Sequence, residues 1–199
     1  VSLCRFADME ERLEVYYGSE DAIPEVTVAV IDTGAYYNHE LLKDRIDDTT
    51  LNVAGYSLPG HWGCADDQGH GTMVASIIAM CTPDYVRILP IKAGDYEGEF
   101  SSSSIYLGIE AAISHEADVI NMSYGIDNDN DPIEEYYMER CTAAGITLVA
   151  AYGNSHISTN SIYPACWPNV IGVSAVNNSM NFASGYSNYG ASVDLSAPG

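Results

Sequence analysis

The amino-acid sequence predicts an α/β fold with three layers, in which a mostly parallel, twisted sheet carries helices on both faces. Segments typical of strands alternate with segments typical of helices along the chain, an order that favours parallel strands joined by helical crossovers. The strand segments are nearly continuous apolar runs, as expected for parallel strands buried on both faces. The 199 residues are 47% hydrophobic and 18% charged, which suits one globular domain with a substantial core.

The strands are predicted from short apolar runs. The first has the sequence VTVAVID, which is rich in β-branched residues, and the others have lengths expected for strands in a buried sheet. The expected strands cover residues 26–32, 86–92, 118–123, 146–151, 170–175 and 193–196.

Three helices are expected between these strands, at residues 72–81, 102–116 and 132–144. The first is apolar throughout and should be buried. The second is amphipathic and begins with a run of serines, which are good capping residues. The third begins at Pro132, which suits a first helical turn, and is followed by Gly145, which suits a C-terminal cap.

The strongly acidic composition limits the partners of the chain. The formal net charge is -21, and a field of this sign repels nucleic acids and anionic membranes, so we expect neither as a partner. No apolar run approaches the ~18 residues of a membrane-spanning helix. The same field would favour cationic peptides.

The five cysteines show no spacing typical of a metal or redox site. Cys4, Cys64, Cys81, Cys141 and Cys166 are irregularly spaced, and no two form a Cys-x-x-Cys pair. Cys81 and Cys141 fall in helical patterns, where a thiol is usually a small buried apolar group. This pattern favours reduced thiols, and with them a cytoplasmic location slightly over a secreted one.

Residues able to do chemistry stand where the predicted strands end. In parallel sheets, binding and catalytic groups gather at the carboxyl ends of the strands. The three strand ends that carry such groups read Asp32-Thr33-Gly34, Ser123-Tyr124-Gly125 and Tyr152-Gly153-Asn154. We therefore expect the functional site at these positions.

Asp32, His70 and Asn154 are the candidate catalytic residues. An aspartate that closes a buried strand is partly desolvated and needs a partner. His70 lies between two glycines just before a predicted helix, and a histidine held by a buried aspartate can activate a nucleophile. The side-chain amide of Asn154 can donate to a developing oxyanion.

The Asp-Thr-Gly tripeptide at Asp32 is also typical of aspartic peptidases. Those enzymes need two such carboxylates that share a proton. This chain has one, so that function would require a homodimer. It would also leave the later motifs unexplained.

The order of the motifs resembles the subtilisin family of serine peptidases (subtilases). The similar segments are AVIDTG around Asp32, GHGT around His70, VINMSYG around Ser123, VAAYGN around Asn154, YPA at 163–165 and DLSAPG at 194–199. The resemblance implies one subtilisin-like peptidase domain over residues 1–199, with residues 1–24 as an N-terminal lead-in. It implies a serine endopeptidase that hydrolyses peptide bonds with an Asp-His-Ser triad.

The resemblance also implies roles for individual residues. Asp32 would orient His70, His70 would act as general base and then general acid, and Asn154 would stabilise the oxyanion. The positions that resemble the family's substrate-binding edges and pocket walls are Gly98, Phe100, Ser123, Tyr124, Gly125, Ala151 and Gly153. Simple core packing explains Phe100 equally well. Ile162 precedes Tyr163 and Pro164, which resemble the border of the pocket floor in the family, where glycine is common. A bulky residue there implies a shallow pocket.

The nucleophilic serine of the family is absent from this sequence. In the family it lies in a Gly-Thr-Ser-Met-Ala pattern, and no segment of the 199 residues matches this pattern. Ser123 and Ser187 lack a preceding Gly-Thr and are not credible substitutes. The fold is therefore expected to be incomplete at its C-terminus, and the chain by itself to be inactive.

Three explanations for the missing serine stay open. The chain is a fragment of a longer active enzyme, or a separate chain completes the fold, or a pseudo-peptidase keeps the shape as a peptide-binding scaffold. The expected partners are a peptide or protein substrate, together with a propeptide or a complementing C-terminal segment.

No cofactor is predicted, and calcium is not supported by a recognisable loop. The loop after the helix at 72–81 is shorter than the calcium loop of many secreted relatives. Asp127, Asp129 and Asp131 alternate like calcium ligands, but an EF-hand would need glycine at Pro132 and glutamate at Met138. A solvated acidic loop is the simpler explanation, and it could favour basic side chains in the substrate.

Overall fold

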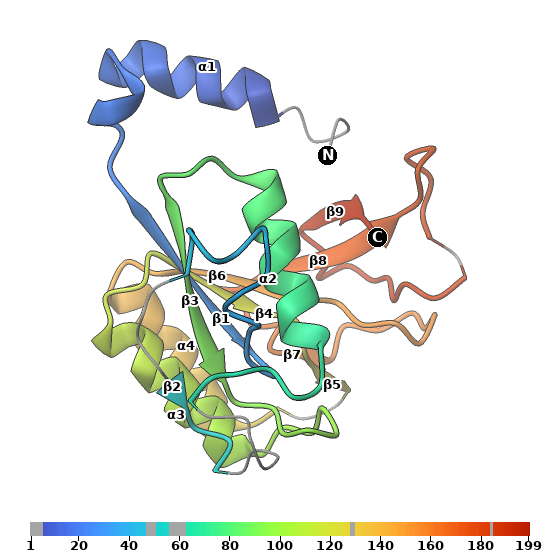
Figure 1. The fold of residues 1–199 in the computed structure, drawn as a ribbon. Helices are drawn as coiled ribbons and strands as arrows, with labels where there is room; N and C mark the ends of the chain where they lie inside the picture. Colours follow the sequence, from blue (N-terminus) through green and yellow to red (C-terminus); the bar gives the residue numbers. More distant parts are fainter. Residues whose placement is uncertain (1–5, 47–50, 56–62, 128–129, 184) are drawn as a thin grey trace. The chain divides into compact units, whose positions relative to one another are not determined.

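The computed structural model describes residues 6–46, 51–55, 63–127, 130–183 and 185–199 (Figure 1). The chain forms two compact units, which comprise residues 1–118 and 119–199. Cys4 and Asp129, which entered the predictions above, lie outside the described residues.

The first unit is built on three parallel strands in the order β2-β3-β1, which are β1 (Val26–Asp32), β2 (Leu51–Asn52) and β3 (Val86–Lys92). Helices α2 (His70–Cys81) and α3 (Ser102–Ser114) both pack against β1 and β3 (Figure 1). Successive strand residues face opposite sides of a sheet, and residues 28–32 are all buried. Both faces of β1 are therefore covered, as its continuous apolar sequence predicts.

Two elements precede β1. They are α1 (Phe6–Tyr17) and the short 3-10 helix η2 (Glu20–Ala22), and neither is predicted from the apolar pattern. Val15 and Tyr16 on α1 are 80% and 81% exposed, so this part of the helix buries little apolar surface. No helix in the described part of the chain is long and apolar enough to cross a membrane.

The second unit contains four parallel strands in the order β4-β6-β8-β9. Helix α4 (Pro132–Ala143) packs against β6, and β5 (Ile126–Asp127) forms a separate antiparallel ribbon with β7 (Ile162–Tyr163). The four strands are β4 (Val119–Met122), β6 (Thr147–Ala151), β8 (Ile171–Val176) and β9 (Leu195–Pro198). The predicted α/β class, with mostly parallel strands and helices packed on them, is confirmed.

Helices α3 and α4 begin where the sequence predicts, at Ser102 and Pro132. Ser101 and Ser104 form a reciprocal capping box at the start of α3, with both hydrogen bonds at 3.1 Å. The carboxylate of Asp131 caps α4 by accepting from the N–H of Ile133 at 2.8 Å. Helix α2 begins two residues before the predicted start, because Gly69 takes a left-handed conformation (φ 108°) that ends the preceding loop.

The cysteines contribute to packing. Cys64 and Cys141 are buried, and Cys81 and Cys166 are partly exposed. No disulfide joins these four residues, which are the cysteines of the described ranges.

A buried arginine ties the C-terminal end of α2 to the start of β3. The guanidinium of Arg45 donates to the carbonyl oxygens of Ala79, Thr82 and Val86 at 2.9–3.2 Å, and to the hydroxyl of Thr82 at 2.9 Å. Its ion pair with Asp84 is long, at 3.4 Å, and the Asp84 side chain is 96% exposed. The carbonyl bonds, rather than the exposed ion pair, should therefore supply most of the stabilisation.

We expect Arg45→Met to lower the free energy of unfolding by about 2–4 kcal/mol, because it leaves buried carbonyl groups without donors. Asp84→Ala should cost less than about 1 kcal/mol, since it removes only an exposed charge. Urea unfolding of both variants measures the difference. Equal losses would show that the ion pair, and not the carbonyl bonds, carries the effect.

Candidate active site

His70 is held at the first position of α2 by a close contact between two backbone segments. A side chain on Gly71, the next residue, would overlap the carbonyl oxygen of Gly34. Only glycine therefore lets the first turn of α2 approach the loop that follows β1. This approach brings His70 to Asp32, the last residue of β1.

Asp32 and His70 form a direct hydrogen bond. His70 Nδ1 lies 2.8 Å from Asp32 Oδ1, and the Asp32 side chain is fully buried while that of His70 is 43% exposed. An ionised carboxylate can only accept, so Nδ1 carries the hydrogen and Nε2 is the basic nitrogen. The structure thus brings together two of the three predicted catalytic residues in the arrangement that activates a nucleophile.

The hydrogen bond to Asp32 raises the pKa of His70 above its ordinary value of 6.5. Partial burial acts in the opposite direction, and the negative charges of Asp32 and Asp66 act in the same direction as the bond. The imidazolium form, which would appear after a proton is taken from a nucleophile, is therefore stabilised.

Asp66 organises the loop that leads to His70, and the sequence analysis did not single it out. Its carboxylate accepts from the N–H groups of Gln68, Gly69 and Thr72 at 2.8–3.0 Å and from the hydroxyl of Thr72 at 2.5 Å. Burial alone would raise the pKa of Asp66, but these hydrogen bonds outweigh it and lower the pKa below 3.8. Asp66 therefore stays ionised and fixes the N-terminal turn of α2.

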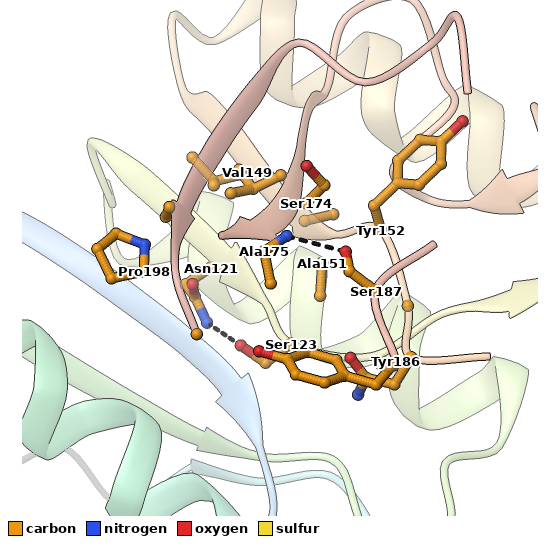
Figure 2. Close-up of a pocket in the computed structure, with 16 residues that line it drawn as sticks. Asn121, Ser123, Val149, Ala151, Tyr152, Ser174, Ala175, Tyr186, Ser187 and Pro198 are labelled. Atoms are coloured by element: carbon orange, nitrogen blue, oxygen red, sulfur yellow. Dashed lines mark hydrogen bonds between the residues drawn. The ribbon is translucent and has the colours of Figure 1, made fainter. Parts of the chain in front are cut away.

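In the second unit, Asn154 lines a cavity of about 440 Å³. Ser123, Ala151 and Gly153 line the same cavity (Figure 2), so these four predicted site residues lie together. The Ser123 hydroxyl accepts from the Asn121 amide at 3.0 Å.

Ser187, which the sequence already excludes as a nucleophile, forms hydrogen bonds with the backbone. Its buried hydroxyl accepts from the Ala175 N–H at 2.9 Å and donates to the Asn188 carbonyl at 3.1 Å. It cannot serve as a free nucleophile in this conformation.

The loop after β6 is held by Asn188, a buried residue that carried no recognisable signal in the sequence. Its side-chain oxygen accepts from the N–H groups of Ser155 and Ile157 at 2.9 and 3.2 Å, and its own N–H donates to the carbonyl of Gly153 at 3.0 Å. Asn154 lies inside this braced loop. Its position is therefore fixed by a residue more than thirty positions later.

Ile162 packs beside two of the predicted pocket residues. Its γ2 carbon lies 3.1 Å from the place where a side chain on Gly125 would begin, and 3.9 Å from the same place on Gly153. Ile162 itself is 5% exposed. The space between these two glycines is therefore narrowed by an apolar side chain.

The predicted substrate edge at Gly98 and Phe100 belongs to the first unit. Gly98 has a φ of 83° in a turn that Asp95 closes, and residues 94 and 100 form an isolated antiparallel bridge. The Phe100 ring lies over Gly94 and is partly buried. These contacts do not separate a substrate contact from simple packing, and the role of Phe100 stays a prediction.

The described residues contain no group of three or more His, Cys, Asp or Glu side chains that could hold a metal ion. Asp127 accepts from the hydroxyl of Ser161 at 2.6 Å, and Asp131 caps α4. At the end of α2, Arg45 already binds the Ala79 and Thr82 carbonyls. The residues there fit a guanidinium rather than a calcium ion.

A buried carboxylate that orients a histidine at the mouth of a helix is the arrangement that hydrolases of the nucleophile-activating class use. A model of the subtilase family matches residues 24–199, and the chain belongs to this family. The predicted family and its subtilisin-like fold are confirmed.

The chain is 35% identical to subtilisin DY of Bacillus licheniformis over 185 residues, which cover 87% of this chain and 64% of the relative. It is 33% identical to the minor extracellular protease Epr of Bacillus subtilis (strain 168), covering 87% of this chain and 27% of that protein. The chain thus spans less than two thirds of the length of these relatives.

Two solved structures are similar in fold. The crystal structure of a lanthipeptide protease matches with a TM-score of 0.75 and 25% identity, covering 87% of this chain and 55% of that one. A cold adapted subtilisin-like serine proteinase matches with a TM-score of 0.73 and 28% identity, covering 88% and 63%.

We expect His70 to titrate above 6.5 in the folded chain. Because the folded state favours the protonated ring, the stability that this group contributes is fully present below its unfolded pKa and is lost as the pH rises through the folded pKa. Asp32→Asn should move the pKa of His70 back toward 6.5. NMR titration of the ring protons measures the pKa of His70 in both proteins. An equal shift in Asp84→Asn, at an exposed site, would show that the overall charge and not the hydrogen bond sets this pKa.

Proposed function

We propose that this chain is the larger part of a serine endopeptidase domain, in which His70 takes the proton from a nucleophilic serine while Asp32 orients the ring and supports its positive charge. The observation that carries the proposal is the 2.8 Å bond between Asp32 and His70 in a chain that belongs to the subtilase family. The basic Nε2 atom is then the acceptor for the hydroxyl proton.

The later steps use the same residues. Attack on the peptide carbonyl gives a tetrahedral intermediate, and the imidazolium of His70 then donates its proton to the leaving amine. The Asn154 amide would donate to the oxyanion, a role typically worth about 100- to 1,000-fold in kcat. The reaction proposed here needs no metal ion or organic cofactor.

We infer that a segment following Gly199 supplies the serine. Met73, Ile77 and Met80 lie on one face of α2 and are 61%, 57% and 52% exposed. An apolar face of this kind is usually covered in a complete domain. In the second unit, Gly199 lines the same cavity as Asn154, so a continuing segment would begin beside this amide.

A longer form of the protein tests the peptidase proposal. A fluorophosphonate probe should label it at a serine beyond Gly199, and His70→Ala should reduce peptide hydrolysis by about 10⁴-fold or more. Asn154→Ala should lower kcat by about 100- to 1,000-fold. A well-folded long form that binds peptides but takes no label would instead support the peptide-binding pseudo-peptidase.

The substrate pocket is proposed to accept small side chains before the cleaved bond, because Ile162 narrows the space between Gly125 and Gly153. At this substrate position the packing of Ile162 favours alanine or serine. The acidic loop alone would favour arginine or lysine. Asp127 of that loop is already paired with Ser161.

In the active long form, Ile162→Gly should raise kcat/KM for a phenylalanine substrate relative to an alanine substrate by about tenfold or more, since each added methylene group is worth roughly 1–3 kcal/mol in an apolar pocket. Peptides that differ only at this residue measure the ratio. Met180→Gly, at a position of the same unit that is 57% exposed and has a φ of 59°, is the matched control. An unchanged ratio, or a wild-type preference for Arg over Ala, would contradict the shallow pocket.

A further inference from the structure

A lysine is fully buried at the end of β3, directly opposite the catalytic aspartate. Parallel pairing of β1 and β3 aligns Lys92 with Asp32. The ammonium group donates to the carbonyl oxygens of Thr33 and Gly94 at 2.9 and 3.0 Å, and to the carboxylate of Asp67 at 2.5 Å. These three bonds use all three ammonium hydrogens.

Burying Lys92 removes from the surface one of the few basic side chains of a strongly acidic chain, and it costs desolvation free energy. The sequence has 7 Lys and Arg residues against 28 Asp and Glu residues, and the side chains of both Lys92 and Asp67 are completely buried. A buried ion pair seldom stabilises a fold more than apolar residues of the same size would. A contribution to the geometry of the neighbouring site is therefore a better explanation than stability alone.

The group that connects Lys92 to the site is Thr33. Its N–H donates to Asp32 Oδ1 at 2.7 Å, the same oxygen that His70 contacts. Its hydroxyl donates to Asp66 at 2.9 Å and accepts from the Gly71 N–H at 2.9 Å. Its carbonyl oxygen is bound by Lys92. All the polar atoms of Thr33 are thus fixed, and each partner lies on an element that carries or adjoins a catalytic residue.

We propose that Lys92 is a positioning residue for the Asp32–His70 pair. By binding the Thr33 carbonyl and Asp67, it joins the end of β1 to the loop that leads into α2, and so holds the Thr33 N–H on Asp32 and His70 at bonding distance. This inference rests on the catalytic roles proposed above for Asp32 and His70.

The test is the titration of His70 by NMR in the 199-residue chain. The charged groups that face this ring are Asp32 at the end of β1 and Asp66 in the loop before α2. In Lys92→Met, a charge effect alone would raise the pKa of His70, because a positive charge is removed. Loss of positioning would lower it instead, because the bond to Asp32 weakens. We expect the pKa to fall.

The double variant Lys92→Met with Asp67→Asn separates the two effects further. It removes both buried charges, so it should fold even if the single variant does not, and its net charge change is zero. We expect the pKa of His70 still to fall. Lys43→Met, at an exposed lysine, changes the overall charge by as much as the single variant Lys92→Met does, and it should leave the pKa of His70 unchanged. A rise in Lys92→Met, or a wild-type pKa in the double variant, would overturn the proposal.

A second readout uses the active long form. There the double variant should lower kcat by about 10- to 100-fold, the scale expected for a small misplacement of catalytic groups, with little change in KM. Equal kcat in the double variant and the wild type would also overturn the positioning role. The NMR measurement needs no activity, so a long form without peptidase activity would count against the proposed function and not against this inference.

Discussion

The structure of the first unit depends on one constraint, the burial of the Asp32 carboxylate. A fully buried negative charge must be matched by hydrogen bonds and an opposite charge, and the chain places His70 and the Thr33 N–H on the same oxygen. The glycine contact between residues 34 and 71 follows from this need, since any larger residue would hold the helix away from β1. The proposed roles of Asp32 and His70 and the local packing therefore require the same geometry.

The neighbouring carboxylates of Asp66 and Asp67 are also partly or fully buried, and each is stabilised by a different kind of donor. Asp66 is balanced by backbone donors at the start of a helix, where N–H groups have no partner within the helix. Asp67 is balanced by the buried ammonium of Lys92. Asp66 and Asp67 are thus compensated by different kinds of donor, which are backbone N–H groups for Asp66 and an ammonium group for Asp67.

Much of this architecture could be predicted from the sequence, and the exceptions have physical reasons. The strands at 26–32 and 86–92 were predicted to the residue, because both are mostly apolar runs that end in a charged residue. Asp32 and His70 could be found because strand ends and flanking glycines are local signals. Lys92, Asp66 and Asn188 act through contacts that exist only once distant strands and loops are in register. A lysine at the end of the apolar run VRILPIK was the one local sign that could have indicated Lys92.

The arginine that binds the end of α2 has a consequence for the conditions under which the fold persists. A metal ion at such carbonyls would be in exchange with solution, and its occupancy would follow the free ion concentration. Arg45 is covalently part of the chain, so its effective concentration at the Ala79 and Thr82 carbonyl oxygens is set by the chain that connects them. It does not change with the ion concentration of the solution. The helix that begins with His70 is therefore anchored at its far end independently of the supply of divalent ions.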